Sequence, residues 1–387
     1  MARAPGRKRI LHLTADYPDA NRADTTLAIR NFVKGNTAAD HLVVSLNRTP
    51  NPLRQNAVDG DGQGDPDVVS MRYWGLPYGV LLALAMAVVA WRVDRVVRRR
   101  GVRIDYVHAH KLTFEGVAGY VLARRWRVPL VCSIRGEVES KIFTYKPHYG
   151  WLLRRILDRS ERLYYVSAWF RPILEKRFPV YAAKALMLPN FAPVVACPPF
   201  DPHRRRRLIT ILRLDAYRKK GLDRLLPALA IALRAAPDLT LDIVGDGGAK
   251  AKAEIGRLIA RHGLEGRAVL VGRRSHDAIL AEMPAFAAMC LPSHNETFGM
   301  VYVEAMLTGT PILYTLGTGI DGFMEGIEGG IGVDARSVDA IADAIVRLVA
   351  DQGRYRRWLT DHHDLIQQRF DGTTQIAAYN RSLGLCA

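Results

Sequence analysis

The sequence has few cysteines and no arrangement of them that would bind metal or form a disulfide framework. Only four of the 387 residues are cysteine, Cys132, Cys197, Cys290 and Cys386, and no two of them have C-x-x-C spacing. Structural zinc sites and disulfide scaffolds depend on such closely spaced cysteines. We therefore expect free thiols in a cytoplasmic protein, with neither disulfides nor zinc.

The sequence also lacks a hydrophobic run long enough to cross a membrane. Leu76 to Trp91 contains no charged residue, but as a helix these 16 residues would span only about 24 Å, short of the ~30 Å hydrocarbon core. The basic N-terminus, Arg3 to Arg9, precedes an apolar run of just four residues, Ile10 to Leu13. That run is too short for a signal peptide and predicts a buried first strand.

Acidic residues are scarce in the first half of the chain. Residues 1–200 contain 31 Lys and Arg against 16 Asp and Glu, whereas residues 201–387 contain 24 against 22. A strongly basic half indicates an anionic partner, which could be a lipid surface, a phosphorylated acceptor or a nucleic acid. Because no aromatic-plus-basic module of the RNA-binding types is present, we do not expect nucleic acid.

Two segments of the first half have competing interpretations. Leu76–Trp91 leads into a run of arginines, which predicts either a buried helix with a solvated basic end or an interfacial helix whose arginines meet anionic lipid. Residues 49–67 contain two closely spaced aspartate pairs that could hold a metal. They are rich in Pro, Asn, Gly and Asp without strand signals on either side, so we predict a solvated loop.

Short apolar runs alternate with amphipathic stretches along the chain, which predicts buried parallel strands connected by helices. Such alternation is typical of a doubly wound α/β architecture, here occurring twice, with a proline-rich break at 190–207. Residues 355–387 have a helical pattern. The predicted strands are 10–13, 106–110, 130–134, 163–167, 208–212, 239–244, 269–271, 288–291 and 311–314.

Two glutamates, Glu296 and Glu304, lie eight residues apart where a strand passes into a helix expected to start near Gly299. Apolar neighbours around Glu304 predict a partly buried carboxylate, which needs hydrogen-bond donors. The hydroxyls of a ribose would supply them, and the free amides at the helix start favour a diphosphate. The alternative is a carboxylate satisfied by a nearby arginine or by backbone.

A second cluster follows the predicted strand 208–212. Arg213 ends that strand, and Lys219, Lys220 and Gly221 open the next helix. Cations at this edge of a sheet can neutralise a pyrophosphate, an electrostatic task for which both Arg and Lys are suited. The alternative is a solvated basic loop.

The combined pattern resembles the retaining, GT-B-fold family-4 glycosyltransferases, the glycosyl transferases group 1. The residues that carry the resemblance are Arg213, Lys220-Gly221, Gly245-Asp-Gly247 and Glu296-x7-Glu304 within Pro-Ser-x-x-Glu-x-Phe-Gly. The resemblance implies a GT-B fold, with two Rossmann-like doubly wound α/β domains facing a central cleft. Residues 1–195 would bind the acceptor, residues 196–365 the nucleotide-sugar, and residues 366–387 would form a helix crossing back to the first domain.

The same resemblance assigns roles to individual residues. It implies front-face substitution with retention, without a covalent nucleophile, a metal or another cofactor, because Arg, Lys and the helix dipole supply the positive charge. His110 and Arg135 are candidates on the acceptor side. The implied catalytic residues are Arg213, Lys220 and Glu296, and the implied donor-binding residues are Lys219, Gly272, Arg273, Thr297, Phe298, Gly299 and Glu304.

Departures from the family pattern lie mostly in the first half. Thr14-Ala-Asp-Tyr-Pro18 stands where a Gly-Gly loop is common, Arg135 stands where a histidine is frequent, and Leu212 precedes Arg213 in place of glycine. These changes leave the acceptor open. A nucleotide-sugar epimerase of the same fold would lack this Glu-x7-Glu context.

The leading hypothesis is therefore a hexosyl-type transferase at the inner face of the cytoplasmic membrane. It would use a UDP- or GDP-linked sugar and act on a lipid or lipid-linked saccharide in bacterial envelope, lipopolysaccharide or exopolysaccharide synthesis. The anionic membrane surface would be a partner of the basic half. The alternative is a catalytically inactive scaffold partner of another transferase.

Overall fold

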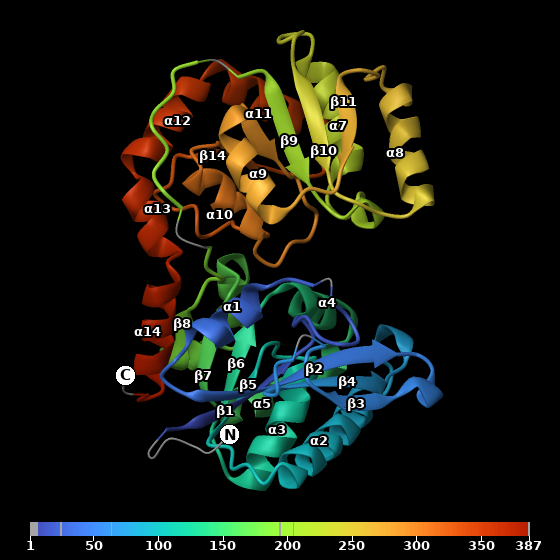
Figure 1. The fold of residues 1–387 in the computed structure, drawn as a ribbon, viewed down its shortest axis with the longest axis vertical. Helices are drawn as coiled ribbons and strands as arrows, with labels where there is room; N and C mark the ends of the chain where they lie inside the picture. Colours follow the sequence, from blue (N-terminus) through green and yellow to red (C-terminus); the bar gives the residue numbers. More distant parts are fainter. Residues whose placement is uncertain (1–6, 24, 63, 193–194, 204, 386–387) are drawn as a thin grey trace. The chain divides into compact units, whose positions relative to one another are not determined.

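The computed structural model describes residues 7–23, 25–62, 64–192, 195–203 and 205–385, so Arg3 and Cys386 lie outside the described residues. The chain forms two compact units (Figure 1). Unit 1 comprises Met1–Val166, Phe170–Asn190 and Gly372–Ala387, and unit 2 comprises Ser167–Trp169 and Phe191–Asp371. Cys132, Cys197 and Cys290 are free thiols, the first and third of them buried.

Unit 1 is built on an eight-stranded sheet of order β3-β4-β2-β1-β5-β6-β7-β8, in which only the edge strand β3 runs antiparallel to its neighbour. Its inner strands are continuous apolar runs, as expected for strands covered on both faces. The prediction of a loop over 49–67 is wrong in part, because β3 lies inside it; its polar sequence suits an exposed edge. The strands are β1 (Arg9–Thr14), β2 (Asp40–Thr49), β3 (Asn56–Asp59), β4 (Val68–Trp74), β5 (Tyr106–Ala109), β6 (Leu130–Ile134), β7 (Ser160–Tyr165) and β8 (Ala185–Met187).

Helices cover both faces of this sheet. One face carries α3, where Gly119 lacks a side chain and a Cβ there would lie 3.4 Å from Ala109 and 3.5 Å from Val107 on β5. α2 and α5 pack beside α3, and α1 and α14 lie together on the opposite face (Figure 1). The helices of unit 1 are α1 (Ala28–Gly35), α2 (Leu82–Arg99), α3 (Phe114–Trp126), α4 (Glu137–Tyr145), α5 (Gly150–Arg159), α6 (Arg171–Arg177) and α14 (Gly372–Ser382).

Helix α2 forms from the apolar stretch and its arginines, and it is buried on one side only. Met86, Val89 and Val93 are fully buried, whereas Val88 and Trp91 are about half exposed. Of the two interpretations, the buried helix therefore describes one side of α2 only, because a second apolar face is open to solvent. Among the described residues, no helix is both long and apolar enough to pass through a membrane.

Three histidines, His41, His12 and His110, form a hydrogen-bonded chain beneath α1 and α14, and His108 stacks on the ring of His110. His12 on β1 contacts His110 at 3.0 Å and His41 at 2.9 Å between ring nitrogens. His108 contacts Ser133 Oγ at 2.9 Å and the Tyr379 hydroxyl of α14 at 3.1 Å. Burial lowers the pKa of His12, His108 and His110, that of His108 to about 3. Neutral imidazoles, each able to donate and accept, therefore join α14 to the sheet.

Unit 2 contains a fully parallel six-stranded sheet of order β11-β10-β9-β12-β13-β14. β9 and β12 are neighbours although two strands separate them in the chain, so connections leave them in opposite directions. α7 and α11 pack together on one face. The strands are β9 (Arg207–Ile211), β10 (Thr240–Val244), β11 (Ala268–Gly272), β12 (Ala288–Cys290), β13 (Ile312–Thr315) and β14 (Gly330–Val333), and the helices are α7 (Leu222–Ala232), α8 (Ala249–Arg261), α9 (His276–Glu282), α10 (Met300–Leu307), α11 (Val338–Ala350), α12 (Gln352–Asp361) and α13 (His363–Arg369).

The helical segment predicted over 355–387 is divided into three helices. α12 and α13 belong to unit 2, and α14 belongs to unit 1. The units divide at 190/191 and 371/372, whereas the sequence pattern placed the boundaries at 195/196 and 365/366. Phe370, buried directly after α13, keeps that helix on unit 2 through ring contacts with Phe298 and Phe323.

The buried histidines predict a loss of stability at mildly acid pH. Their pKa values in the folded chain lie below the ~6.5 of an exposed histidine, so below that pH the unfolded chain binds more protons. The contribution of these histidines to stability is therefore full above pH ~6.5 and falls toward pH 3, by up to about 1.4 kcal/mol per pH unit for each histidine. Urea unfolding followed by circular dichroism at pH 7.5, 6 and 5 measures this.

The exposed His148 provides the control for that experiment. His148→Gln is expected to leave the pH dependence unchanged, whereas His108→Gln is expected to weaken it. An equal pH dependence in His108→Gln and in the unmodified protein would contradict the assignment of a neutral buried histidine.

Candidate functional site

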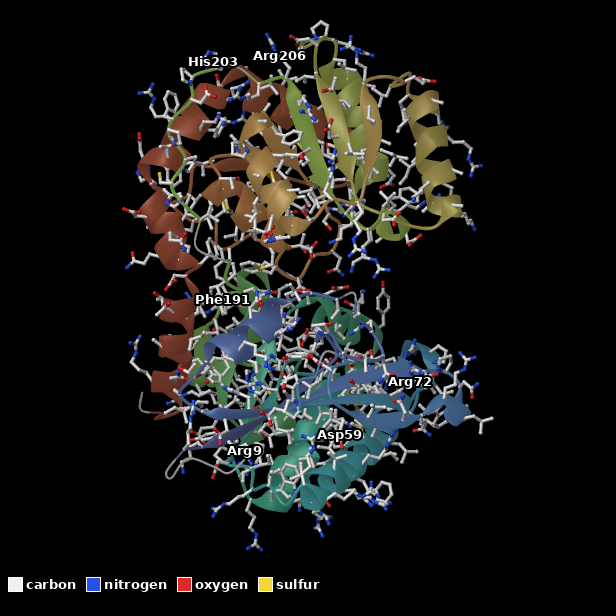
Figure 2. The ribbon with its side chains drawn as sticks, in the orientation of Figure 1. Arg9, Asp59, Arg72, Phe191, His203 and Arg206 are labelled. Carbon is white, nitrogen blue, oxygen red and sulfur yellow. The ribbon has the colours of Figure 1, made fainter. Side chains whose placement is uncertain are left out.

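The predicted donor residues gather where β9 and β12 end. Arg206, labelled in Figure 2, precedes β9, and the loops that carry the site leave from the other end of that strand. Lys219, Lys220 and Gly221 lie between β9 and α7, and Pro292 to Gly299 lie between β12 and α10. Because β9 and β12 are adjacent and parallel, the two loops share one edge of the sheet.

Gly221 lets the two loops touch. Its φ is +73°, and a Cβ at this position would lie 1.9 Å from the carbonyl oxygen of Pro292, so only glycine is accommodated. The amide of His294 donates to the carbonyl of Lys219 at 2.9 Å, and the Ser293 hydroxyl donates to the same oxygen at 3.3 Å. The loop that carries Lys219 and Lys220 is thereby fixed against the segment that carries Glu296.

The Gly-Asp-Gly turn supports the residues on either side of Arg213. Gly245 has a φ of +150°, and a Cβ there would lie 1.8 Å from the Leu212 carbonyl oxygen. The Leu214 amide donates to the carbonyl of Asp246 at 2.9 Å. Leu212 and Leu214 are buried, and Arg213 between them is exposed at the sheet edge.

Lys220 and Glu296 form an ion pair in the structure. The Lys220 ammonium donates to Glu296 Oε2, and both side chains are mostly buried. Thr318, which the sequence analysis did not single out, holds the glutamate from behind: its hydroxyl accepts from the Glu296 amide at 2.8 Å, and the Gly319 amide donates to the Glu296 carbonyl at 3.0 Å. The pair places one positive and one negative charge at the mouth of the site.

The turn into α10 has the expected form. Gly299 is the N-cap of α10 with a φ of +79°, and a Cβ there would lie 2.5 Å from the Tyr302 ring. Phe298 is buried against Phe323 and Phe370 and anchors this turn in the core. Thr297 also belongs to the turn, where its carbonyl accepts from Trp169 Nε1 at 3.4 Å.

Glu304 is nearly buried, as predicted, but its partner is neither arginine nor backbone. Its Oε1 lies 3.0 Å from His276 Nε2, and the His276 side chain is about half exposed. Sequence reasoning missed His276. The one available signal was its place at the start of α9, just after β11, because parallel strands end at the same sheet edge.

Gly272 ends β11 with a φ of +85°, and nothing lies within 4 Å of the position a Cβ would take. Its carbonyl accepts from the Gly245 amide at 3.0 Å, which ties this turn to the Gly-Asp-Gly turn. Arg273 follows it and is exposed. The backbone here is open to a planar ring.

The two acceptor-side candidates lie in unit 1 and are packed inside it. His110 is 3% exposed, bonded to His12 and stacked on His108 at 4.0 Å between ring centroids. Arg135 is 5% exposed, and its Nε donates to the His110 carbonyl at 3.1 Å. Burial lowers the pKa of Arg135, while Asp16 and Glu115 act in the opposite direction.

His12, His108 and His110 also have ring nitrogens close enough together to hold a metal ion. The ring nitrogens of His12 form hydrogen bonds with His110 and His41, and the ring nitrogens of His108 form hydrogen bonds with Ser133 and Tyr379. Because hydrogen bonds already use both nitrogens of these two rings, the cluster is accounted for by packing.

In unit 2, by contrast, the exposed cations and the amides before α10 form a surface suited to an anion.

Comparison with known proteins agrees with this geometry. Residues 205–351 match the family model "Glycosyl transferases group 1", and residues 26–190 match "Glycosyl transferase 4-like domain". The chain is 25% identical to a glycogen synthase of Mycobacterium tuberculosis, over 96% of this chain and 93% of that protein. It is 24% identical to a D-inositol 3-phosphate glycosyltransferase of Mycolicibacterium gilvum, over 91% of this chain and 80% of that protein.

Solved structures show the same fold. A sucrose-phosphate synthase from Thermosynechococcus elongatus superposes with a TM-score of 0.73 at 19% identity, covering 98% of both chains. HepE from Anabaena, solved in complex with UDP and glucose, superposes with a TM-score of 0.71 at 20% identity, covering 98% of this chain and all of that one. The two family models together cover most of the chain, which is therefore a glycosyltransferase of the GT-B type built from a glycosyl transferase 4-like domain and a glycosyl transferases group 1 domain.

Proposed function

We propose that this glycosyltransferase takes a sugar from a UDP- or GDP-linked donor and transfers it, with retention, to a lipid or lipid-linked saccharide in bacterial envelope or exopolysaccharide synthesis. The observation that carries the proposal is the pairing of Lys220 with Glu296 at one edge of the sheet. The nearly buried Glu304 lies in α10, the helix that begins just after Glu296. That edge is where nucleotides bind in open α/β sheets. The complex of HepE with UDP and glucose supports a UDP-linked donor.

In this proposal the cations bind the diphosphate. Arg213 and Lys219 are exposed, and Lys220, the residue after Lys219, is partly buried. A diphosphate that takes over the charge of Lys220 would free the oxygens of Glu296 for hydroxyls of the transferred sugar. The amides at Thr297, Phe298 and Gly299, before the positive end of α10, add to the same field.

Glu304 and the turn after β11 bind the nucleoside. Glu304 accepts from His276, a partner half exposed and able to swing away. Two ribose hydroxyls would replace that imidazole with two hydrogen bonds to a charged acceptor. The base would lie against Gly272 and Arg273.

The chemical step then depends mainly on electrostatics. Negative charge develops on the departing phosphate, and Arg213, Lys220 and the amides before α10 are the groups that stabilise it. We propose that the leaving phosphate itself accepts the proton of the acceptor hydroxyl on the same face, which retains the anomeric configuration. No metal is needed in this scheme, because these cations carry its role.

An anionic membrane surface is the proposed partner of unit 1. The exposed apolar side chains on α2, Leu84, Val88 and Trp91, are followed by the arginines of its second half, and Arg95 lies over the Trp91 ring at 4.8 Å. Apolar contact combined with basic charge is the composition of interfacial helices.

Nucleotide binding tests the donor site. UDP, GDP, ADP and CMP are titrated into the protein by calorimetry, and one diphosphate is expected to bind. Glu304→Gln is expected to weaken that binding at least tenfold, because each lost hydrogen bond to a charged group costs about 1.5–3 kcal/mol. The exposed Glu265→Gln is the control. Equal binding by both variants would contradict the ribose role of Glu304, and no binding of any nucleotide would favour the inactive scaffold.

Turnover tests the reaction. With the nucleotide-sugar so identified, Lys220→Ala is expected to lower kcat by about 10²- to 10³-fold, because it removes a charge that stabilises the leaving phosphate. EDTA is expected to leave the rate unchanged, and proton NMR of the product is expected to show the donor's anomeric configuration. An inverted product or a rate abolished by EDTA and restored by Mg²⁺ would refute the corresponding part of the mechanism.

Membrane docking is tested by sedimentation with lipid vesicles. Binding to phosphatidylglycerol vesicles is expected to fall with rising salt, since screening weakens contacts with anionic lipid. Trp91→Ala is expected to reduce binding several-fold, while Val269→Ala, which shortens an exposed apolar side chain of unit 2, leaves it unchanged. Indifference to anionic lipid would count against docking.

A further inference from the structure

Unit 1 contains a large cavity at the carboxyl edge of its sheet. Its volume is about 780 Å³, and it lies between the ends of β1, β2 and β4, the start of α2 and α3, and helix α4. Ligands of open α/β sheets bind at this edge. The cavity contains none of the residues that the sequence analysis assigned to the acceptor side.

The walls of this cavity are mostly apolar. Leu82 and Ala85 of α2 form one wall, and Val138 and Ile142 of α4 form another. Val80, next to the start of α2, lines the cavity and is about half exposed, and it is followed by the exposed Leu81. The apolar lining thus reaches the solvent-exposed apolar side of α2. A binding cavity lined this way suits an apolar chain rather than a sugar.

Cations line the same cavity. Arg22, Arg48 and Lys146 all contribute to it, and within the described part of the chain none of the three is paired with a carboxylate. Arg48 donates to the Leu76 carbonyl at 2.9 Å, and Lys146 lies 5.8 Å from the centre of the Tyr149 ring. Arg22 still helps to lower the pKa of Asp16, but none of the three cations forms an ion pair among the described residues. Cations of this kind beside an apolar cavity complement an anionic amphiphile.

A buried carboxyl group lies at the polar part of the lining. Glu115 is fully buried; its Oε1 accepts from the Ala15 amide at 2.9 Å, and its Oε2 has no hydrogen-bond partner among the described residues. Burial raises the pKa of Glu115 to about 7, against the charge of the neighbouring Lys111. Lys111 pairs with Asp16 at 2.7 Å. An unpaired buried oxygen is costly, and a hydroxyl of a bound ligand would satisfy it.

We propose that this cavity binds the acceptor as an anionic amphiphile: an isoprenoid or acyl chain lies between α2 and α4, a phosphate contacts Arg22, Arg48 and Lys146, and a hydroxyl next to the phosphate contacts Glu115. The inference rests on the proposed function and narrows its acceptor to a phosphorylated lipid. It assigns a chain-binding role to Ala85 and Val138. The apolar chain would enter from the exposed apolar side of α2.

The test uses the full-length protein and a soluble probe, dodecyl phosphate, below its critical micelle concentration. Calorimetry compares it with methyl phosphate and with dodecyl maltoside. Dodecyl phosphate is expected to bind, methyl phosphate not to bind, and dodecyl maltoside to bind at least tenfold more weakly. Ala85→Phe places a larger side chain in the cavity from α2, and it is expected to weaken the binding of dodecyl phosphate at least tenfold. Ala253→Phe, at an exposed helical position of unit 2 outside the lining, is the matched control and is expected to bind normally.

A second filling variant, Val138→Phe on α4, guards against a folding defect in the first, and near-ultraviolet circular dichroism verifies that each variant is folded. The proposal is overturned if dodecyl phosphate does not bind, if folded filling variants bind it as the control does, or if methyl phosphate binds equally well. UDP binding by the same variants separates the two hypotheses. If UDP binds and dodecyl phosphate does not, the lipid inference fails alone; if UDP does not bind to the unmodified protein, the donor function has failed.

Discussion

The donor site depends on the close contact between Gly221 and the backbone of Pro292. Two loops that belong to different crossovers meet there because the first has no side chain at that point and has a positive φ. The contact holds the Lys219 carbonyl against the amide of His294. Lys220 and Glu296 meet only because of this backbone arrangement, so the electrostatics of the site follow from a steric requirement. The turn at Gly245, after the neighbouring strand β10, depends on the same steric requirement, because a side chain there would collide with the Leu212 carbonyl.

The ion pair itself contributes to orientation more than to stability. Lys220 and Glu296 retain 23% and 14% of their side-chain exposure, and pairs of this kind add little net free energy once desolvation and side-chain entropy are counted. Their value lies in charges already in place before a diphosphate arrives. Glu304 is prepared in the same way, since His276 satisfies its carboxylate with a side chain that is half exposed.

In unit 1, the face of the sheet beneath α14 and the carboxyl edge of the sheet differ in structure and chemistry. One face carries a chain of neutral, buried histidines that attaches α14, and His110 and Arg135 belong to this packed region. The carboxyl edge has an apolar cavity with unpaired cations and a buried carboxyl group. The excess of basic residues in the first half of the sequence is thus partly concentrated where an anionic amphiphile would be held.

The sequence by itself determined the fold class, the two parallel sheets and the donor motif, because buried parallel strands are continuous apolar runs and the spacing from Glu296 to Glu304 covers the turn before α10 and the first half of that helix. It missed β2, β3, β4, β8 and β14, of which β3 has polar residues that suit an exposed edge, and it missed the breaks among α12, α13 and α14. It could not find His276 or Thr318, which reach the two glutamates only because parallel strands end at one edge. Nor could it reveal the cavity of unit 1, whose lining comes from segments more than a hundred residues apart. Local pattern determines which elements form, but which side chains meet depends on strand order, and only the tertiary structure decided that.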